Sequence, residues 1–163
     1  MDSADEVSQR VHECGGTVAV GPLQAEQAGR PAMAADVSGA VFGLWQGEEH
    51  LGWQVADWNH LAPDVPTAAA FYRGVLGRQP SPRPDGSADL LVDGEPVVGI
   101  HCGTAPGWPH WQVHFAVTDA DLTVRQAVGL GGQVLDGPEE TPYGRAARPA
   151  DPQGGRFSVI EVG

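Results

Sequence analysis

Three side chains that can exchange protons or hydrogen bonds alternate along one short run of the chain. In "PHWQVHFAV", residues 109–117, His110, Gln112 and His114 occupy every second position. Alternate residues of a β-strand lie on the same face, so these imidazoles and this amide would line one side of a strand whose other side is apolar. Such a face is either wetted by solvent or directed into a cavity that needs hydrogen-bonding groups.

Histidine suits acid–base catalysis because it exchanges protons near neutral pH. Two histidines in one pocket could act as base and acid in an enolisation, an aldol or retro-aldol step, or a cyclisation. The chain contains nine arginines and no lysine. Chemistry through a lysine Schiff base or a P-loop lysine is therefore excluded, and any aldol-type step would pass through an enol or enolate.

Charge and composition exclude several classes of partner. The chain of 163 residues has a formal net charge of −12, which argues against binding nucleic acid through phosphate contacts. No apolar run approaches the roughly 20 residues that span a membrane, and the acidic N-terminus does not resemble a secretory signal. Cys14 and Cys102 form no CxxC pattern, which argues against structural zinc. We expect a cytoplasmic protein that binds neither nucleic acid nor membrane.

The chain repeats itself. The glycine pair 15–16 matches 131–132, Asp36 matches Asp151, and the order of the surrounding residues is kept. The later copy predicts a strand "WQVHFAV", a helix over 121–130 that ends at the glycine pair, and three strands, "QVLDGP", "GRAARPA" and "RFSVIEV". An Asp-Pro-Gln-Gly turn joins the last two strands. This order defines a β-α-β-β-β unit.

The middle of the chain predicts a second unit of the same kind. It has a strand "WQVADWNHL", a helix "PDVPTAAAFYRGVLG" and strands "ADLLV" and "EPVVGI", with "RQPSPRPDGS" as a loop or irregular edge. The first copy begins at its helix and lacks the first strand. We therefore predict an α+β protein with a partial αβββ unit over 1–50 and a module of two βαβββ units over 51–163.

Nearly the whole chain resembles the glyoxalase/bleomycin-resistance/extradiol-dioxygenase superfamily, also called vicinal oxygen chelate proteins. The resemblance rests on "DVPTAAAFYRGVLG", "PHWQVHFAVTDADLTVRQAVGLGGQVL", "TPYGRAARPADPQGGRFSVIEV" and "AVFGLWQGEEHLG". Within this superfamily, the resemblance is greatest to actinobacterial members that contain two modules in tandem and are described as hydroxylases. It implies that the paired units form an incomplete mixed-sheet barrel whose concave side holds a metal or a substrate.

The ligand positions that this resemblance implies do not carry a complete metal triad. They fall on Gln112, on Ser158 where metal-binding members have glutamate, and on Trp58, or on Asp57 in another alignment. Glu161 would lie on the opposite face from Ser158. We therefore expect no cofactor. A divalent metal held in a shifted register by His60, His114 and Glu161 is the alternative.

The resemblance also implies which residues line the concave side. We expect His60 and His114 to be the catalytic pair, with His60 on the same face as Trp58. We expect the following residues to contact the substrate: Trp58, His110, Trp111, Gln112, Tyr143, Arg145, Ser158 and Ile160. The walls would be aromatic, which suits a small aromatic ligand.

Three functions remain open at this point. The first is a metal-independent enzyme that performs acid–base chemistry on an aromatic or polyketide-like metabolite of secondary metabolism. The second is a protein that sequesters a drug or metabolite, and the third is a metal-dependent lyase or dioxygenase. The partial unit adds an expectation about assembly, because an unpaired sheet edge is a liability in a monomer. We expect it to pair with its counterpart in a homodimer or to pack on the module of the same chain, unless the sequence is a fragment of a longer protein.

Overall fold

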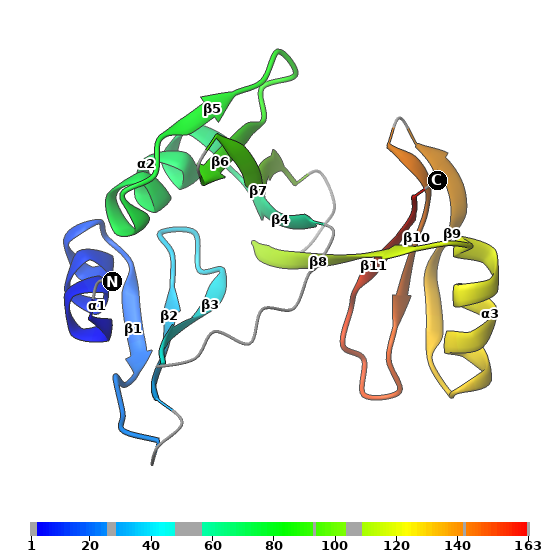
Figure 1. Ribbon diagram of the computed structural model, residues 1–163, viewed down its shortest axis with the longest axis horizontal. Helices are drawn as coiled ribbons and strands as arrows, with labels where there is room; N and C mark the ends of the chain where they lie inside the picture. Colours follow the sequence, from blue (N-terminus) through cyan, green and yellow to red (C-terminus); the bar gives the residue numbers. More distant parts are fainter. Residues whose placement is uncertain are drawn as a thin grey trace. The chain divides into compact units, whose positions relative to one another are not determined.

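The computed structural model describes residues 3–25, 29–47, 57–92, 94–103, 109–141 and 143–162. In chain order the elements are α1 (Ala4–Glu13), β1 (Thr17–Val20), β2 (Arg30–Ala35), β3 (Val41–Gln46), β4 (Asp57–Ala62), α2 (Val65–Leu76), β5 (Pro80–Pro82), β6 (Ala88–Val92), β7 (Glu95–Cys102), β8 (His110–Val117), α3 (Ala120–Gly129), β9 (Gln133–Thr141), β10 (Gly144–Ala150) and β11 (Ser158–Glu161) (Figure 1). The order is αβββ, then βαβββ twice, so the predicted α+β class and the partial first unit are confirmed.

The repeat extends to individual hydrogen bonds. Ser3 and Asp119 cap α1 and α3, and each side chain accepts a bond from the N–H three residues further on. Asp36 and Asp151 open equivalent turns, where Oδ1 accepts from the N–H groups two and four residues further on. Two unrelated turns would not be expected to share this pattern of hydrogen bonds. The shared pattern therefore supports the view that the units are repeats of one supersecondary structure.

The glycine pairs are needed where each helix returns to its sheet. A Cβ atom on Gly16 would lie 2.6 Å from the carbonyl oxygen of Ala35, and one on Gly132 would lie 2.6 Å from that of Ala150. Real Cβ atoms do not approach a carbonyl oxygen so closely. Glycine at these two positions therefore allows the chain to leave the helix directly against the neighbouring strand.

The described parts of residues 1–53 and 59–111 form one compact unit. It contains the antiparallel sheet β1–β2–β3 and the strands β5, β6, β7 and β4, which are hydrogen-bonded in that order, with β4 parallel to β7. Helix α1 packs against α2, and the guanidinium of Arg10 donates to the carbonyl oxygen of Val75 over 2.9 Å. Both helices contribute to one core, made of Val11, Ala34, Ala62, Val65, Ala68, Ala69, Phe71, Tyr72, Val75, Ala88, Leu90 and Ile100. The partial unit thus shares its core with the first complete unit.

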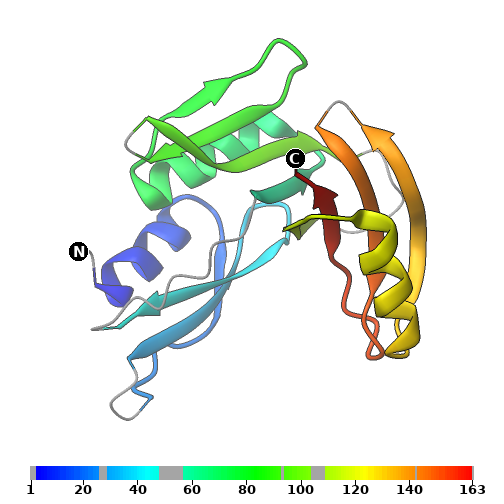
Figure 2. The same cartoon turned by 45° about the vertical axis from the view of Figure 1, so that its right-hand side comes forward.

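The described parts of residues 54–58 and 112–163 form the other compact unit. Its strands β8, β11, β10 and β9 are hydrogen-bonded in that order, and β8 is parallel to β11. Helix α3 covers one face of these strands (Figure 2) and packs through Ala120 and Val124 against Ala147 and Val159. Within this unit, the described residues place no helix on the other face.

Two strands at sheet edges contain proline. β5 lies in the segment expected to be a loop or irregular edge, and β9 continues beyond the predicted strand "QVLDGP" to Thr141. Both strands lie at the end of their row of strands. An edge strand tolerates proline because the missing N–H would have pointed away from the sheet. Of the helices described, none is long and apolar enough to cross a membrane.

Candidate functional site

His60 lies in the core beneath α2. Its side chain is fully buried, and alternation along β4 places it on the same side as Ala62, which packs in that core. Its ring meets Tyr72 of α2 edge-on, with the centroids 5.4 Å apart. We expected His60 to line the concave side of the sheet, and the structure places it in the core under α2 instead. Alternation shows which residues share a face, but it does not show which face the helix covers.

A carboxylate of the partial unit reaches His60. Oδ2 of Asp36 lies 2.7 Å from Nε2 of His60 and accepts a hydrogen bond from the Tyr72 hydroxyl over 3.1 Å. All three side chains are buried. Burial alone would raise the pKa of Asp36, but the contact with His60 and the hydrogen bonds from Ser38 and Ala40 outweigh it and hold this pKa below its usual range. Asp36 is therefore a buried carboxylate.

Tyr72 and Trp111 complete this buried cluster. Burial, and then the charge and the hydrogen bond of Asp36, raise the pKa of Tyr72, so its phenol stays protonated and donates. The Trp111 ring lies edge-on to His60 and Tyr72, at 5.1 and 5.3 Å between centroids. The sequence pattern assigned neither Asp36 nor Tyr72 to a site. The one available signal was the hydroxyl of Tyr72 at an apolar helix position, since such a hydroxyl needs a buried acceptor.

The polar face predicted for β8 exists in the second unit. Nε2 of Gln112 donates to Oγ of Ser158 over 2.5 Å, and both side chains are buried. In the parallel ladder, Ser158 lies opposite His114 and Ile160 lies opposite Ala116. The structure thus brings Gln112, His114, Ser158 and Ile160 onto one sheet face, as expected.

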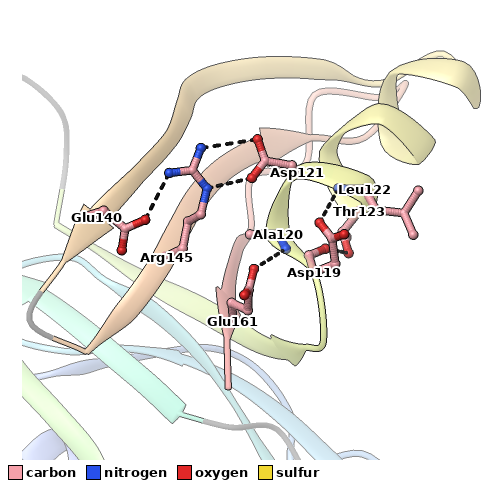
Figure 3. A network of polar contacts seen from close by, with 8 residues as sticks. All are labelled: Asp119, Ala120, Asp121, Leu122, Thr123, Glu140, Arg145 and Glu161. Carbon is pink, nitrogen blue, oxygen red and sulfur yellow. Dashed lines mark hydrogen bonds and ion pairs between the residues drawn. The ribbon is translucent and has the colours of Figure 1, made fainter. Parts of the chain in front are cut away.

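This face is turned away from α3, because the neighbouring residues Val117 and Val159 pack in the α3 core. We call it the α3-free face, made of Gln112, His114, Ser158 and Ile160. His114 is half-buried on it. Glu161 lies on the other side, where its Oε2 accepts from the N–H of Ala120 over 3.0 Å (Figure 3). The predicted opposition of Ser158 and Glu161 is therefore confirmed.

Arg145 already holds carboxylates of its own chain. Its guanidinium lies 2.5 Å from Oδ2 of Asp121 and 3.1 Å from Oε1 of Glu140 (Figure 3). The hydrogen bonds to Asp121 and Glu140 raise the pKa of Arg145 further above its usual value. Tyr143 is 67% exposed. The structure therefore assigns Arg145 to the contact between α3 and its sheet, and it leaves Tyr143 in solvent.

Arg145→Gln should leave the affinity for an aromatic ligand and the thermal unfolding midpoint close to those of the wild type. The reason is that exposed ion pairs are screened by water and contribute little to stability. Isothermal titration and a thermal melt test this expectation. A large loss of affinity at an unchanged midpoint would contradict it and return Arg145 to the ligand site.

The remaining predicted residues are placed as follows. His110 and Trp111 are half-buried and belong to the first unit, as does His60, whereas His114 belongs to the second. The catalytic pairing of His60 with His114 therefore stays a prediction. The side chain of Trp58 lies outside the described residues.

The donor set on the α3-free face does not fit a divalent metal. The ligand position implied for glutamate is occupied by Ser158, whose Oγ already accepts from Gln112. Glu161 is held by the start of α3. Within the described ranges, no group of three or more His, Cys, Asp or Glu side chains is arranged to hold a metal ion. The α3-free face therefore presents hydrogen-bonding groups where a metal-binding module would present a ligand triad.

The repeated βαβββ units and the polar strand face opposite the helix define a glyoxalase-type module. A family model described as the glyoxalase-like domain matches residues 53–160, more than half of the chain. The chain therefore belongs to the glyoxalase-like family, within the vicinal oxygen chelate superfamily.

Two curated relatives match almost the whole chain. The anthracycline biosynthesis protein DauV of Streptomyces sp. (strain C5) is 39% identical, over 99% of this chain and 63% of its own length. The anthracycline biosynthesis protein DnrV of Streptomyces peucetius is 38% identical over the same shares. The chain thus spans less than two thirds of the length of these relatives.

A solved structure supports the fold. The 2,3-dioxygenase LapB from Pseudomonas sp. KL28 superposes with a TM-score of 0.61 over 98% of this chain and 67% of that chain, at 16% sequence identity. An identity this low shows the fold alone. The likeness to this dioxygenase therefore supports the glyoxalase-type fold of the chain and carries no statement about its chemistry.

Proposed function

We propose that this protein acts on a polycyclic aromatic metabolite of the anthracycline type, by proton transfer at a carbon next to a carbonyl group and without a metal. The observation that carries this proposal is the similarity to two anthracycline biosynthesis proteins along 99% of the chain. The chain covers only 63% of the length of these relatives, so their names alone do not establish its activity. The proposed activity is therefore also argued from the residues of this chain.

The α3-free face supplies groups that suit this chemistry. His114, half-buried opposite Ser158, serves as the base that removes the proton and returns it. The Ser158 hydroxyl already accepts from Gln112, so its own proton is free to be donated to the oxygen of the resulting enolate. His60 is assigned a structural role, because Asp36 and Tyr72 enclose it.

Solvent deuterium exchange tests this proposal without knowledge of the final product. A panel of anthracycline aglycones is incubated with the protein in D₂O, and exchange at carbons next to carbonyl groups is followed by mass spectrometry. Each event moves one proton from carbon to the base and one deuteron back, so no other reactant is needed. His114→Gln should lower the exchange rate by about 10²- to 10⁴-fold, with a nearly unchanged ligand affinity.

His12→Gln is the control, because the same substitution then falls on an exposed histidine of α1 and leaves His114 in place. It should retain most of the exchange rate. If the wild type binds an aglycone and catalyses no exchange, the protein is a sequestering protein and the catalytic proposal is wrong. If exchange requires an added divalent ion, the metal-independent part of the proposal is wrong.

A further inference from the structure

Arg148 lies on the side of the sheet that carries the α3-free face. Its neighbour Ala147 packs in the α3 core, so alternation along β10 directs Arg148 to the opposite side. Among the described residues, the guanidinium contacts one carboxylate, that of Asp136 on β9, through a single terminal nitrogen. The Arg148 side chain is 48% exposed. Its remaining N–H groups therefore have no acceptor among the described residues and are open to a ligand.

The strand register places Arg148 beside Ser158. Ala147 pairs with Val159 in the antiparallel ladder, so the next residues, Arg148 and Ser158, lie opposite each other. The same register continues beyond them, because the N–H of Phe157 donates to the carbonyl oxygen of the residue after Arg148 over 3.2 Å. Directly opposite residues in such a ladder have Cβ atoms about 4.5–5.5 Å apart. Arg148 is therefore the immediate neighbour of the α3-free face.

A row of polar residues thus crosses the strands β8, β11, β10 and β9, which lie side by side in this order. Ser158 lies opposite His114 on β8, and Arg148 lies opposite Asp136 on β9. Ser158 is buried, whereas Arg148 is half exposed. The backbone positions of His114 and Arg148 are two strand spacings apart, about 10 Å. The cation therefore lies toward the solvent-exposed end of the row, well separated from the proposed base.

A row of apolar residues lies next to the polar one. Ile160 pairs with Ala116 of β8 on one side and with Ala146 of β10 on the other. Both alanines have small side chains, so a flat ring can approach this row closely. A ligand that covers the apolar row and also contacts the polar row needs a flat apolar body with an acidic group at its edge. A fused-ring skeleton is wide enough to reach both His114 and Arg148.

We propose that Arg148 binds a carboxylate of the substrate, so that the protein selects aromatic acids over their neutral amides. This inference rests on the proposed function, in which the α3-free face is the ligand site. A planar guanidinium and a carboxylate match in shape and charge and form parallel hydrogen bonds. Because the chain has a net charge of −12, an anionic ligand needs a cation at its site. Arg145, on the α3 side of the same strand, does not serve, since Asp121 and Glu140 already hold it.

Isothermal titration with a matched pair of ligands tests this proposal. Anthraquinone-2-carboxylate and anthraquinone-2-carboxamide share one ring system and differ in charge. The wild type should bind the carboxylate about 10-fold more tightly, the low end for hydrogen bonds to a charged group, because water reaches the half-exposed guanidinium. Arg148→Gln should lose this preference by binding the carboxylate more weakly, with a nearly unchanged affinity for the carboxamide. Its thermal unfolding midpoint should stay close to that of the wild type, since an exposed ion pair contributes little to stability.

Arg145→Gln is the matched control, because the same substitution then falls on the other face of the same strand, and this variant should keep the preference. Arg148→Lys keeps the charge but not the planar fork, so it should retain part of the preference. The proposal is overturned if the wild type binds neither probe or binds both equally well. It is also overturned if Arg148→Gln keeps the preference, or if Arg145→Gln loses it to the same extent.

This outcome is separate from that of the deuterium-exchange experiment, because the preference is measured without turnover. A protein that prefers the carboxylate through Arg148 and catalyses no exchange would contradict the proposed function and leave the carboxylate contact in place. A protein that catalyses exchange through His114 and binds both probes equally well would contradict the role of Arg148 alone.

Discussion

Asp36→Asn should destabilise the protein by about 2–5 kcal/mol, because two buried groups lose their contact with a charged oxygen, at about 1–3 kcal/mol for each group. The substitution keeps Oδ1, which accepts from Ser38 and Ala40 and holds the turn. It replaces the oxygen that lies 2.7 Å from Nε2 of His60 and accepts from Tyr72 with an amide. Tyr72 would then be buried without its acceptor, and His60 without the carboxylate oxygen beside it. Urea unfolding followed by circular dichroism measures the change.

The repeat provides the control for this substitution. Asp151 makes the same turn bonds through Oδ1, but it is exposed and faces solvent with its remaining oxygen. Asp151→Asn therefore reports the cost of the turn alone, which should stay below about 1 kcal/mol, as for exposed polar substitutions in general. If the two variants lose the same stability, the contact with His60 and Tyr72 contributes nothing and the buried cluster is misassigned.

The sequence predicted the parts of this fold that depend on neighbouring residues. The glycine pairs that end α1 and α3 and the turn that begins at Asp151 depend on a few neighbouring positions, so they could be predicted from the sequence, and the matching glycine pairs and aspartates also revealed the repeat. The shared face of Gln112 and Ser158 was predictable too, because strand alternation and the resemblance placed both residues on it. These features need no knowledge of what packs against them.

The environment of His60 could not be predicted, because it depends on a contact between distant segments. Asp36 comes from the partial unit and Tyr72 from α2, and no spacing rule connects either residue to β4. The ion pair of Arg145 could not be predicted for a similar reason. Asp121 lies in a helix that precedes the strand of Arg145 by two elements, and no spacing rule connects the two residues. Charge pairing across elements is a property of the packing.

Acid should remove the stability that Asp36 provides, and the comparison with Asp36→Asn should show it directly. Asp36 faces two titratable groups, His60 and Tyr72, and its pKa in the folded state is held below its usual range, although burial opposes this. Above the unfolded-state pKa of about 4, the carboxylate is ionised in both states and its contribution is complete. As the pH falls below about 4, the unfolded chain takes up the proton first, and the contribution is lost progressively toward the folded-state pKa.

At about pH 5, one unit above the unfolded-state pKa of about 4, the stability gap between the wild type and Asp36→Asn should therefore contain nearly the whole contribution of the ionised carboxylate. It should shrink by on the order of 2–3 kcal/mol at lower pH, as for a carboxylate whose folded-state pKa is held well below its unfolded value. Subtracting the variant removes the contributions of other carboxylates, such as Asp5 and Asp121, whose pKa values Arg30 and Arg145 lower. Urea unfolding at a series of pH values measures the gap. A gap that is as large at about pH 3 as at about pH 5 would mean that Asp36 gains no stability from being ionised.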